Sequence, residues 1–227
     1  MSDPVHELDK LDELHELVAP LDDLLGALAG LLGEAAVAPL RSVALSAHPS
    51  LCPDAETPPV LRRWPAATSF TAVGALCRAM ADRSGAKGQR WTRNAGYRSD
   101  NTPPGFLDNY AYLEVVGPSA PLVSTTVRLG FLLLGPSTLY PEHAHPADEV
   151  YVSLGPGWWS RDDDGWRELP GSSVIHHPSG CRHAMRTGPS PMAALYLWTG
   201  QIDAPAEMVS TPIVVADSCS SGRPVSD

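Results

Sequence analysis

The first third of the chain carries hydrophobic residues at helical spacing. Leucine or valine recurs every three or four positions, with acidic residues between, at Leu8, Leu11, Leu14, Val18, Leu21, Leu25, Leu28 and Leu32. This spacing places the apolar side chains on one face of a helix. Pro20 lies inside the pattern, and we expect it to break or kink the helix because proline lacks an amide hydrogen.

A second helical pattern covers residues 70–80. Its apolar positions are Phe70, Val73, Cys77 and Met80. Thr68 and Ser69 come directly before it, and the hydroxyl of either residue can cap a helix. Residues 45–67 are rich in Pro, Ala and Ser and predict a loop. Residues 82–108 form a polar connection rich in Gly, Asn and Arg, and we expect it to cover the mouth of a pocket, as long loops often do.

From about residue 109 to 215 the pattern changes to short β-type runs separated by Pro and Gly. These runs are YAYLEVV, LVSTTVRLGFLLL, EVYVSL, GWWSR, GSSVIHH, AALYLW and TPIVV. Many short strands with regular turn signals predict a sandwich or barrel. We therefore divide the chain into an N-terminal helical region with its connection (1–108), a β-barrel (109–215) and a flexible tail (216–227). The helices are expected to pack on the barrel, to form a dimer contact or to act as a lid.

Composition narrows the functional classes. The formal net charge is -10, and no basic cluster is present to contact phosphates, which argues against nucleic-acid binding. The four cysteines form no CxxC pair, which is typical of reduced thiols in an intracellular protein. The first twenty residues lack the basic start and apolar core of a signal peptide, and no stretch is long and apolar enough to span a membrane. We expect a cytoplasmic protein.

The stretch YPEHAHPADEVY, residues 140–151, gathers two histidines, one glutamate and two tyrosines. His143, His145, Glu149 and Tyr151 are all odd-numbered, so on an extended backbone they share one face. Pro146 is expected to bend the chain there. Two imidazoles and a carboxylate supply three ligands of the kind that a divalent transition metal takes.

An isolated HxH pair often arises by chance on an exposed strand, so the second cluster matters. PSGCRH, residues 178–183, combines a turn with a further histidine on the next strand. His6, His15 and His48 lie in the helical and loop regions and are interpreted as surface residues.

The two clusters resemble the paired motifs of the cupin family. HAHPADE matches HxHxxxE, and PSGCRH matches PxGxxH, with about the family's spacing between them. The resemblance implies a small antiparallel jelly-roll barrel with a metal inside, preceded here by an N-terminal α-helical region. Carried over residue by residue, it implies four metal ligands, namely His143, His145, Glu149 and His183. The departures from the motifs concern the loop positions Gly135, Gly155, Gly171 and Thr187.

Three nearby residues match no ligand position of the motifs. His176 and His177 precede the second motif, and we expect one to be buried in a hydrogen bond and the other to be exposed. Cys181 is interpreted as a small core or turn residue.

Residues 105–201 further resemble the cupin-type dimethylsulfoniopropionate (DMSP) lyases, above all the DddQ type. In that family one tyrosine precedes HxH and another follows the glutamate by two positions, which here are Tyr140 and Tyr151. The resemblance implies cleavage of DMSP to dimethyl sulfide and acrylate. It also implies one transition-metal ion per chain, with zinc, iron and manganese as the candidates.

The chemistry fits those residue types. The reaction is a β-elimination, in which a base removes the proton α to a carboxylate and the sulfonium leaves as a neutral sulfide. A tyrosine ionises near pH ~10, so it becomes a base only when a nearby cation stabilises its phenolate. The resemblance supports a tyrosine base without choosing between the two. We favour Tyr140 as the base and Tyr151 as a residue close to the metal.

The sulfonium end of the substrate requires a site for a soft cation, and aromatic faces attract such cations. Trp158, Tyr196 and Trp198 are the candidates for substrate contact, and each is equally compatible with ordinary packing. Tyr196 and Trp198 alternate along one run and therefore share a face.

Two other functional classes remain open at this point. One is a different metal-dependent cupin enzyme, an isomerase or oxygenase acting on a small carboxylate, because the same ligand set serves those reactions. The other is a non-catalytic cupin that binds a small ligand. In each case the partner is a small molecule, and a homodimer is a candidate assembly.

Overall fold

The structure is a computed structural model that describes residues 4–41, 57–86 and 89–209, with side chains from residue 16 onward. The helical part contains α1 (Pro4–Leu32), α2 (Glu34–Arg41), the 3-10 helix η1 (Pro59–Arg63), α3 (Trp64–Ala67) and α4 (Ala72–Ala86). The predicted tail at 216–227, the TPIVV run and most of the predicted 45–67 loop lie outside the described residues. None of the helices in the described ranges is long and apolar enough to cross a membrane.

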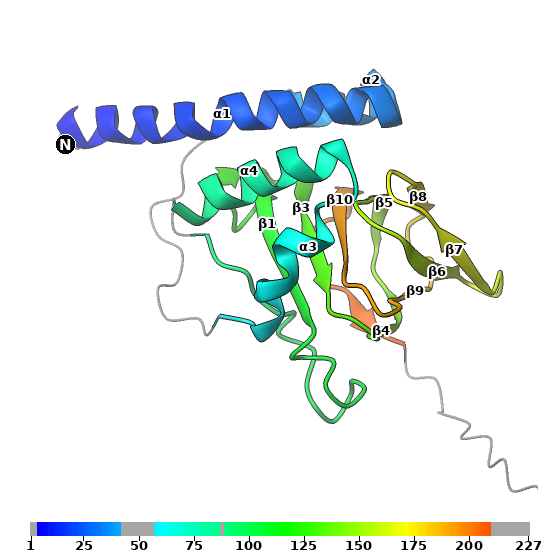
Figure 1. Cartoon of the computed structure of the whole chain (residues 1–227). Helices are drawn as coiled ribbons and strands as arrows, with labels where there is room; N and C mark the ends of the chain where they lie inside the picture. Colours follow the sequence, from blue (N-terminus) through cyan, green and yellow to red (C-terminus); the bar gives the residue numbers. More distant parts are fainter. Residues whose placement is uncertain (1–3, 42–56, 87–88, 210–227) are drawn as a thin grey trace, which may run out of the picture.

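Helix α1 does not end at Pro20. It runs without interruption from Pro4 to Leu32 (Figure 1), so the prediction of a break was wrong. Its buried leucines lie on both sides of the proline, at Leu17, Leu21, Leu24, Leu25 and Leu28. Packing of this face against α4 stabilises the helix and compensates for the one backbone hydrogen bond that proline removes.

Helix α4 buries the predicted apolar positions Val73, Cys77 and Met80, but it begins after Phe70, which is half exposed. The cap also differs from the prediction. The Thr71 hydroxyl accepts a hydrogen bond from the Gly74 amide at 3.0 Å, as an N-cap side chain does. The hydroxyls of Thr68 and Ser69 donate backward to carbonyls of α3 instead.

The β-region forms two facing sheets rather than one closed barrel. The six-stranded sheet has the order β2 (Leu122–Val123), β1 (Tyr110–Gly117), β3 (Val127–Leu134), β10 (Met192–Gly200), β5 (Ala147–Ser153) and β8 (Val174–His177). The five-stranded sheet has the order β11 (Glu207–Met208), β4 (Leu139–Ala144), β9 (His183–Arg186), β6 (Gly157–Arg161) and β7 (Trp166–Leu169). Every pair is antiparallel except β1 with β2. The prediction of a mainly β fold preceded by helices is confirmed.

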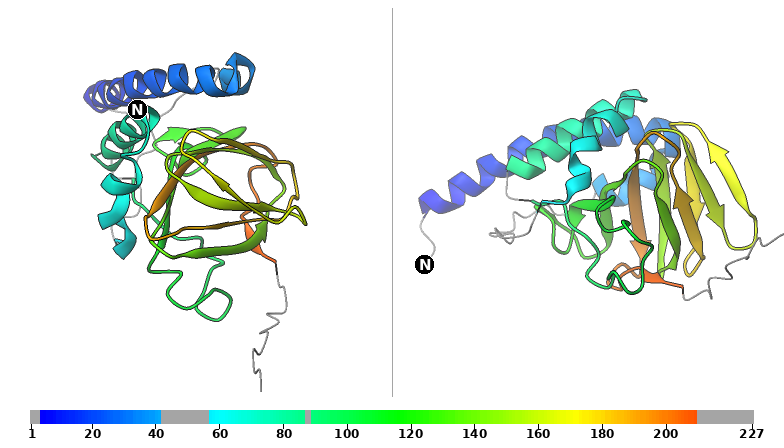
Figure 2. Two further views of the ribbon diagram at one scale, coloured as in Figure 1. Left: turned by 45° about the vertical axis from the view of Figure 1, so that its right-hand side comes forward. Right: turned by 60° about the horizontal axis from the view of Figure 1, so that its bottom comes forward.

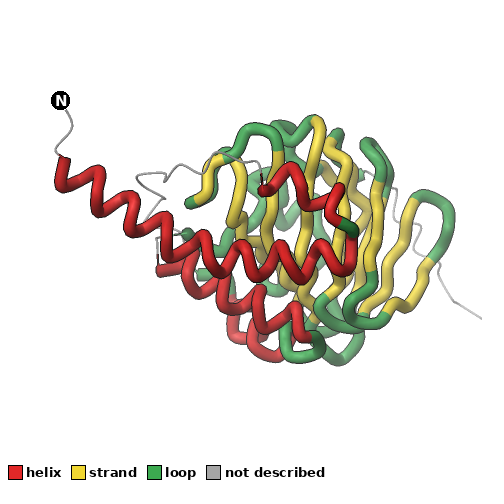
Figure 3. Tube along the Cα trace, turned by 90° about the horizontal axis from the view of Figure 1, so that it is seen from above, coloured by secondary structure: helices red, strands yellow, loops and turns green. Residues whose placement is uncertain are grey.

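Two hydrophobic cores result from this layering. The helix-side core lies between the helices and the outer face of the six-stranded sheet, and its members include Leu24, Leu28, Met80, Phe131, Leu133 and Val152. The inter-sheet core lies between the two sheets, and its members include Phe106, Tyr110, Tyr140, Tyr151, Trp159 and Tyr196. Figure 2 shows the helices outside the β-structure, and Figure 3 shows them lying across the strands. The helices therefore pack on the sheet, which agrees with the first of the three roles that the sequence predicted for them.

Strand β5 shows how alternation selects between the two cores. Val152, and Leu154 just after the end of the strand, belong to the helix-side core, whereas Glu149 is buried and Tyr151 belongs to the inter-sheet core. Neighbouring side chains on a strand point to opposite faces. The polar half of the His-rich stretch is thereby directed between the sheets, as its parity predicted.

Candidate metal centre

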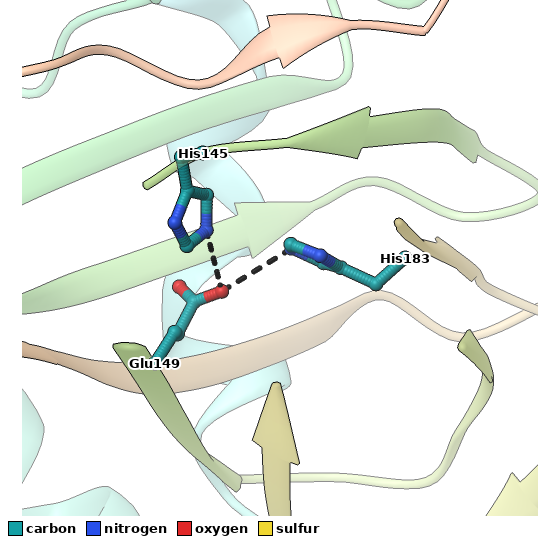
Figure 4. Close-up of side chains that lie close together, drawn as sticks. All are labelled: His145, Glu149 and His183. Carbon is teal, nitrogen blue, oxygen red and sulfur yellow. Dashed lines mark hydrogen bonds and ion pairs between the residues drawn. The ribbon is translucent and has the colours of Figure 1, made fainter. Parts of the chain in front are cut away.

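Pro146 separates two strands that belong to different sheets. His145 follows the end of β4, and Glu149 lies in β5. His183 is the first residue of β9, the neighbour of β4. The bend at Pro146 and this pairing bring His145, Glu149 and His183 together, with ligand atoms that all lie within 4.8 Å of one another (Figure 4). All three side chains are buried.

The hydrogen bonds of His145 determine which ring nitrogen carries the proton. Its Nδ1 lies 3.1 Å from the Ala147 carbonyl oxygen, which can only accept, so Nδ1 is the donor in the neutral ring. The lone pair of Nε2 then points at Glu149 Oε2, 3.0 Å away. A carboxylate oxygen also only accepts a hydrogen bond. Two lone pairs thus face each other in the neutral state.

His183 repeats this arrangement. Its Nδ1 donates to the Cys181 carbonyl at 3.0 Å. Its Nε2 lies 3.2 Å from the same Glu149 oxygen and has no hydrogen-bond partner among the described residues. Two imidazole lone pairs and a carboxylate oxygen therefore converge on one point. A transition-metal ion satisfies such a set, and its histidine ligands usually donate their second N–H to a backbone carbonyl, as both do here.

The carboxylate of Glu149 is held in its charged form. Burial by itself would raise the pKa of Glu149, but the imidazoles of His145, His177 and His183, in the form in which a ring carries a second proton and donates it to the carboxylate, lower this pKa well below its usual range. The second carboxylate oxygen, Oε1, accepts a hydrogen bond from Trp198 Nε1 at 2.5 Å. The Trp198 ring also stacks on the His145 ring at 4.0 Å between centroids. Trp198 therefore orients two of the three residues that converge here, Glu149 and His145.

His143 lies beside this group and not within it. Its Nδ1 is 2.8 Å from the Pro141 carbonyl oxygen, and its ring stacks on Tyr140 at 3.9 Å and meets His183 at 4.1 Å. Burial and the nearby His183 lower the pKa of His143 well below its usual value. The ring is therefore neutral near pH 7, and a neutral imidazole has a nitrogen lone pair that can bind a metal ion. Its predicted ligand role stays a prediction.

A cavity of about 270 Å³ opens next to the three-residue group. Its aromatic lining consists of Tyr110, Tyr112, Tyr140, Tyr151, Tyr196 and Trp198. Glu114 and Arg128 also line it, but they neutralise each other through an ion pair of 2.6 Å. The cavity therefore presents tyrosine hydroxyls and aromatic faces beside the carboxylate of Glu149.

Both candidate base residues line this cavity, and both are buried. Burial and then the neighbouring tyrosines raise the pKa of Tyr140 well above its usual value. Burial and then the charge of Glu149 raise the pKa of Tyr151 in the same direction. Without a cation in the site, neither phenol ionises near pH 7. A bound metal ion reverses this electrostatic balance.

Comparison with known proteins identifies the family. The sequence profile of the dimethylsulfoniopropionate lyases matches residues 36–194, which is more than half of the chain. The chain belongs to the DMSP lyase family.

Two curated relatives carry the names of DMSP lyases. The DddL protein of Cereibacter sphaeroides, assigned as a DMSP lyase, is 36% identical over 146 residues, which are 62% of this chain and 59% of that protein. The DMSP lyase DddQ of Ruegeria pomeroyi is 31% identical over 108 residues, which are 47% of this chain and 54% of DddQ. The chain thus matches less than two thirds of the length of either relative.

Solved DMSP lyases share the fold. The crystal structure of DddQ from Ruegeria pomeroyi superposes with a TM-score of 0.66 at 25% identity, over 84% of this chain and 96% of that chain. A structure from the work on the DMSP lyases RdDddP and RnDddQII gives the same TM-score at 19% identity, over 88% and 99% of the two chains. The cupin-like architecture with N-terminal helices is therefore that of solved members of the DMSP lyase family.

The three aromatic residues predicted to contact substrate separate into two groups. Tyr196 and Trp198 both line the cavity, with ring centroids 6.2 Å apart. Trp158 is not among the lining residues, and its half-buried ring lies under the Arg186 guanidinium at 5.5 Å. The alternation of β6 turns Trp159 inward, where its ring is 5.2 Å from that of Tyr151. Trp158 therefore lies outside the lining of this cavity, and its contact with substrate stays a prediction.

His177 is a site residue to which the sequence assigned no ligand role. Of the two adjacent histidines, His176 is exposed and pairs with Asp148 at 3.0 Å, while His177 is buried, as expected for one of them. However, neither ring nitrogen of His177 has a hydrogen-bond partner among the described residues. Its Nδ1 lies 3.7 Å from Glu149 Oε2, beyond hydrogen-bond distance. Its place in the site follows from the pairing of β8 with β5, in which it lies opposite Glu149.

Tyr97 is a second residue that the sequence did not single out. It lies in the polar connection after α4, and its hydroxyl is 2.8 Å from the Tyr140 hydroxyl. Three other residues of that connection, Asn94, Ala95 and Gly96, line the cavity. The expected covering of the pocket by this segment agrees with their position.

Proposed function

We propose that this protein is a metal-dependent DMSP lyase that cleaves its substrate by β-elimination to dimethyl sulfide and acrylate. The observation that carries the proposal is the convergence of three acceptor atoms from His145, Glu149 and His183 beside a tyrosine-lined cavity. Membership of the DMSP lyase family supports the substrate.

His145, Glu149 and His183 would hold the metal ion. When bound, the ion supplies positive charge that stabilises a substrate carboxylate, the negative charge developing next to it, and a nearby phenolate. Zinc, iron and manganese all suit two imidazoles and a carboxylate, and availability decides among them. Trp198 keeps the Glu149 carboxylate in place through Nε1.

Tyr140 acts as the base in this proposal. Its phenolate oxygen takes the proton from the carbon next to the substrate carboxylate. The electrons of that C–H bond form the new C=C bond, and the electrons of the C–S bond leave as a lone pair on neutral dimethyl sulfide. Tyr151 lies on the Glu149 side of the cavity, and Glu149 is the largest charged influence on its pKa. We assign Tyr151 to the region next to the metal.

The aromatic faces of the cavity receive the sulfonium end of the substrate. Tyr196 and Trp198 offer ring faces to the cavity, whose lining also holds the carboxylates of Glu149 and Asp203 as well as Glu114, which is paired with Arg128. A cation against an aromatic face gains about 0.5–2 kcal/mol. A neutral sulfide loses this attraction, so the same surface favours release of the product.

Headspace gas chromatography for dimethyl sulfide tests the proposal. The purified chain is loaded separately with zinc, manganese and ferrous iron, and is then given DMSP beside a His145→Ala control. We expect release with at least one metal and none from the control. No release from folded, metal-loaded protein would refute the assigned substrate and redirect the search to other small carboxylates.

A pair of variants tests the choice of base. Tyr140→Phe is expected to abolish turnover while the protein still binds metal, whereas Tyr151→Phe weakens metal binding together with turnover. Full activity in both variants would refute a tyrosine base.

The homodimer and the cytoplasmic location stay predictions. Light scattering of the purified chain tests the homodimer.

A further inference from the structure

The proposed lyase reaction produces one proton per turnover, and this proton must leave a buried base. Cleavage of the zwitterion yields a neutral sulfide, the acrylate anion and one proton. Tyr140, which receives this proton, is only 3% exposed. The base must pass the proton on before it can react again, and the following inference rests on that proposed function.

Tyr97 is the hydrogen-bond partner of Tyr140. The two hydroxyl oxygens are 2.8 Å apart, which is a strong O–H···O distance. Both rings belong to the inter-sheet core. Tyr97 packs against Phe106 and Tyr110, with ring centroids at 6.1 and 5.6 Å, so its ring is held in place on two sides.

The two tyrosines line different spaces. Tyr140 lines the cavity of about 270 Å³, and Tyr97 does not. Tyr97, which is 6% exposed, lines a larger groove of about 1110 Å³, and Tyr140 does not. The wall between the two spaces is lined on both sides by Asn94, Gly96, Pro205 and Ala206. The pair of hydroxyls therefore crosses this wall.

The segment that carries Tyr97 is fastened by its own hydrogen bonds. Asn94 Nδ2 donates to the Ala206 carbonyl at 2.9 Å, which ties the connection to the end of the β-region. The Tyr97 amide donates to the Asn94 carbonyl at 3.0 Å, and Asn101 Nδ2 donates to the Gly96 carbonyl at 2.9 Å. The position of the Tyr97 hydroxyl is thus set by the loop and not by Tyr140 alone.

We infer that Tyr97 relays the proton from Tyr140 through the wall to solvent in the larger groove. The Tyr140 hydroxyl donates its proton to the Tyr97 oxygen while the Tyr97 hydroxyl proton passes to solvent. This transfer leaves Tyr97 as a phenol and Tyr140 as a phenolate, ready for the next substrate. No oxidant or further reactant is consumed.

The titratable groups around Tyr97 are mostly other phenols. Those that influence it or respond to it are Tyr110, Tyr112, Tyr140, Tyr151 and Glu149. Burial raises the pKa of Tyr97, whereas hydrogen bonds with Tyr140 and Asn94 lower it. No described lysine or arginine is among these neighbours, so the relay works by concerted transfer between neutral hydroxyls and not by a permanently charged Tyr97.

Tyr97→Phe isolates the relay, because it removes one hydroxyl and keeps the ring packing. We expect the first turnover to keep its wild-type rate, because Tyr140 begins as a phenolate. Steady-state kcat should then fall about tenfold, less than the ~10²-fold or more expected for loss of a direct general base. Rapid-quench measurement of acrylate should show a burst of one product per active site followed by slow turnover, with KM lowered by about the same factor as kcat because the slow step follows C–S cleavage.

Two further readouts separate a relay from a structural role. In D₂O the slow phase of Tyr97→Phe should become slower by a larger factor than wild-type turnover, while the burst rate stays unchanged. Thr102→Val is the matched control, since it removes a hydroxyl from the same loop that bonds only locally, to the Arg98 carbonyl at 2.6 Å. This control should behave as the wild type.

The outcomes are distinguishable. Wild-type release of dimethyl sulfide combined with a Tyr97→Phe variant that shows no burst and an unchanged kcat would overturn the relay and leave the lyase function standing. A parallel loss of burst and steady-state rates, or a raised KM, would assign Tyr97 a packing role and also overturn the relay. An inactive wild type would overturn both.

Discussion

The two cores of this molecule bury side chains of different chemistry. The helix-side core is largely aliphatic, with leucines from α1 meeting leucines and valines of the six-stranded sheet. The inter-sheet core is aromatic and surrounds four buried histidines and a buried glutamate. The first core stabilises the fold through the burial of apolar surface alone. The second leaves polar lone pairs unsatisfied, which costs stability and prepares the site for a cation.

This difference shows that the residues that stabilise the fold and the residues that form the site lie in separate cores. Strand β5 contributes to both cores, with Val152 on one side and Glu149 on the other. The helices and one face of the sheet form a rigid support, and the other face carries the chemistry. A substitution in the helix-side core should therefore lower stability and leave activity unchanged. A substitution at the site in the inter-sheet core should lower activity and leave stability nearly unchanged.

His145→Ala should have the largest effect on activity. A catalytic metal ion contributes several kcal/mol to transition-state stabilisation, so losing one ligand should lower kcat/KM by about 10³-fold or more. The metal-free variant should unfold at about the same temperature as the metal-free wild type, because the change removes a lone pair that faces a carboxylate. Calorimetry with and without chelator checks this, and a large loss of stability in the metal-free variant would contradict the comparison.

Leu24→Ala should have the opposite profile. Leu24 is fully buried in the helix-side core, and removing such a side chain costs about 2–5 kcal/mol of unfolding free energy. Activity per folded molecule should stay at the wild-type level. Urea unfolding measures the loss, and Leu31→Ala on the same helix is the control, because Leu31 is 37% exposed. Equal losses in the two variants would refute the assignment of this core.

Trp198→Phe should show an intermediate effect within the inter-sheet core. It removes the Nε1 donor to Glu149 while keeping an aromatic ring beside His145. Partners that orient metal ligands are worth about 10–100-fold in metal affinity or activity. A competitive chelator titration measures the affinity. Trp166→Phe is the control on an exposed ring, and an unchanged affinity in Trp198→Phe would show that Glu149 needs no orientation.

His177→Gln is expected to have the smallest effect. Burial lowers the pKa of His177 to about 4, so the ring is neutral near pH 7 and makes no ion pair with Glu149. At 3.7 Å it supports the carboxylate only weakly, and metal affinity should fall by about tenfold at most. His176→Gln, on the exposed side of the same strand, is the control. A loss of affinity equal to that of His145→Ala would make His177 a metal ligand.

Patterns within short segments of the sequence were sufficient to predict much of this structure. The odd-numbered positions of the His-rich stretch and the alternation of β10 predicted which side chains share a face, because a strand has a period of two. The helical spacing of the leucines predicted α1 for the same kind of reason. The family motifs assigned His143, His145, Glu149 and His183, and the structure brings the last three together.

Local pattern failed where distant segments decide the outcome. Pro20 does not end α1, because the buried leucines on both sides of it pack against α4. Trp158 and Trp159 are adjacent residues with the same strand propensity. Only the pairing of β6 with β9 determines which of them faces the residues of the candidate metal centre. Tyr97 is separated from Tyr140 by 43 positions, and nothing in its neighbourhood along the chain indicates the contact.

The sequence by itself therefore determined the element types and the polar face of β5, which follow from periodicity and residue chemistry, both properties of short segments. The resemblance of two short motifs to the cupin family assigned the residues that converge on the candidate metal site. Only the tertiary structure decided which hydroxyls meet, which imidazoles remain without a partner and which indole orients Glu149. Those contacts depend on how two sheets and a covering loop pack together, and packing is a property of the whole chain.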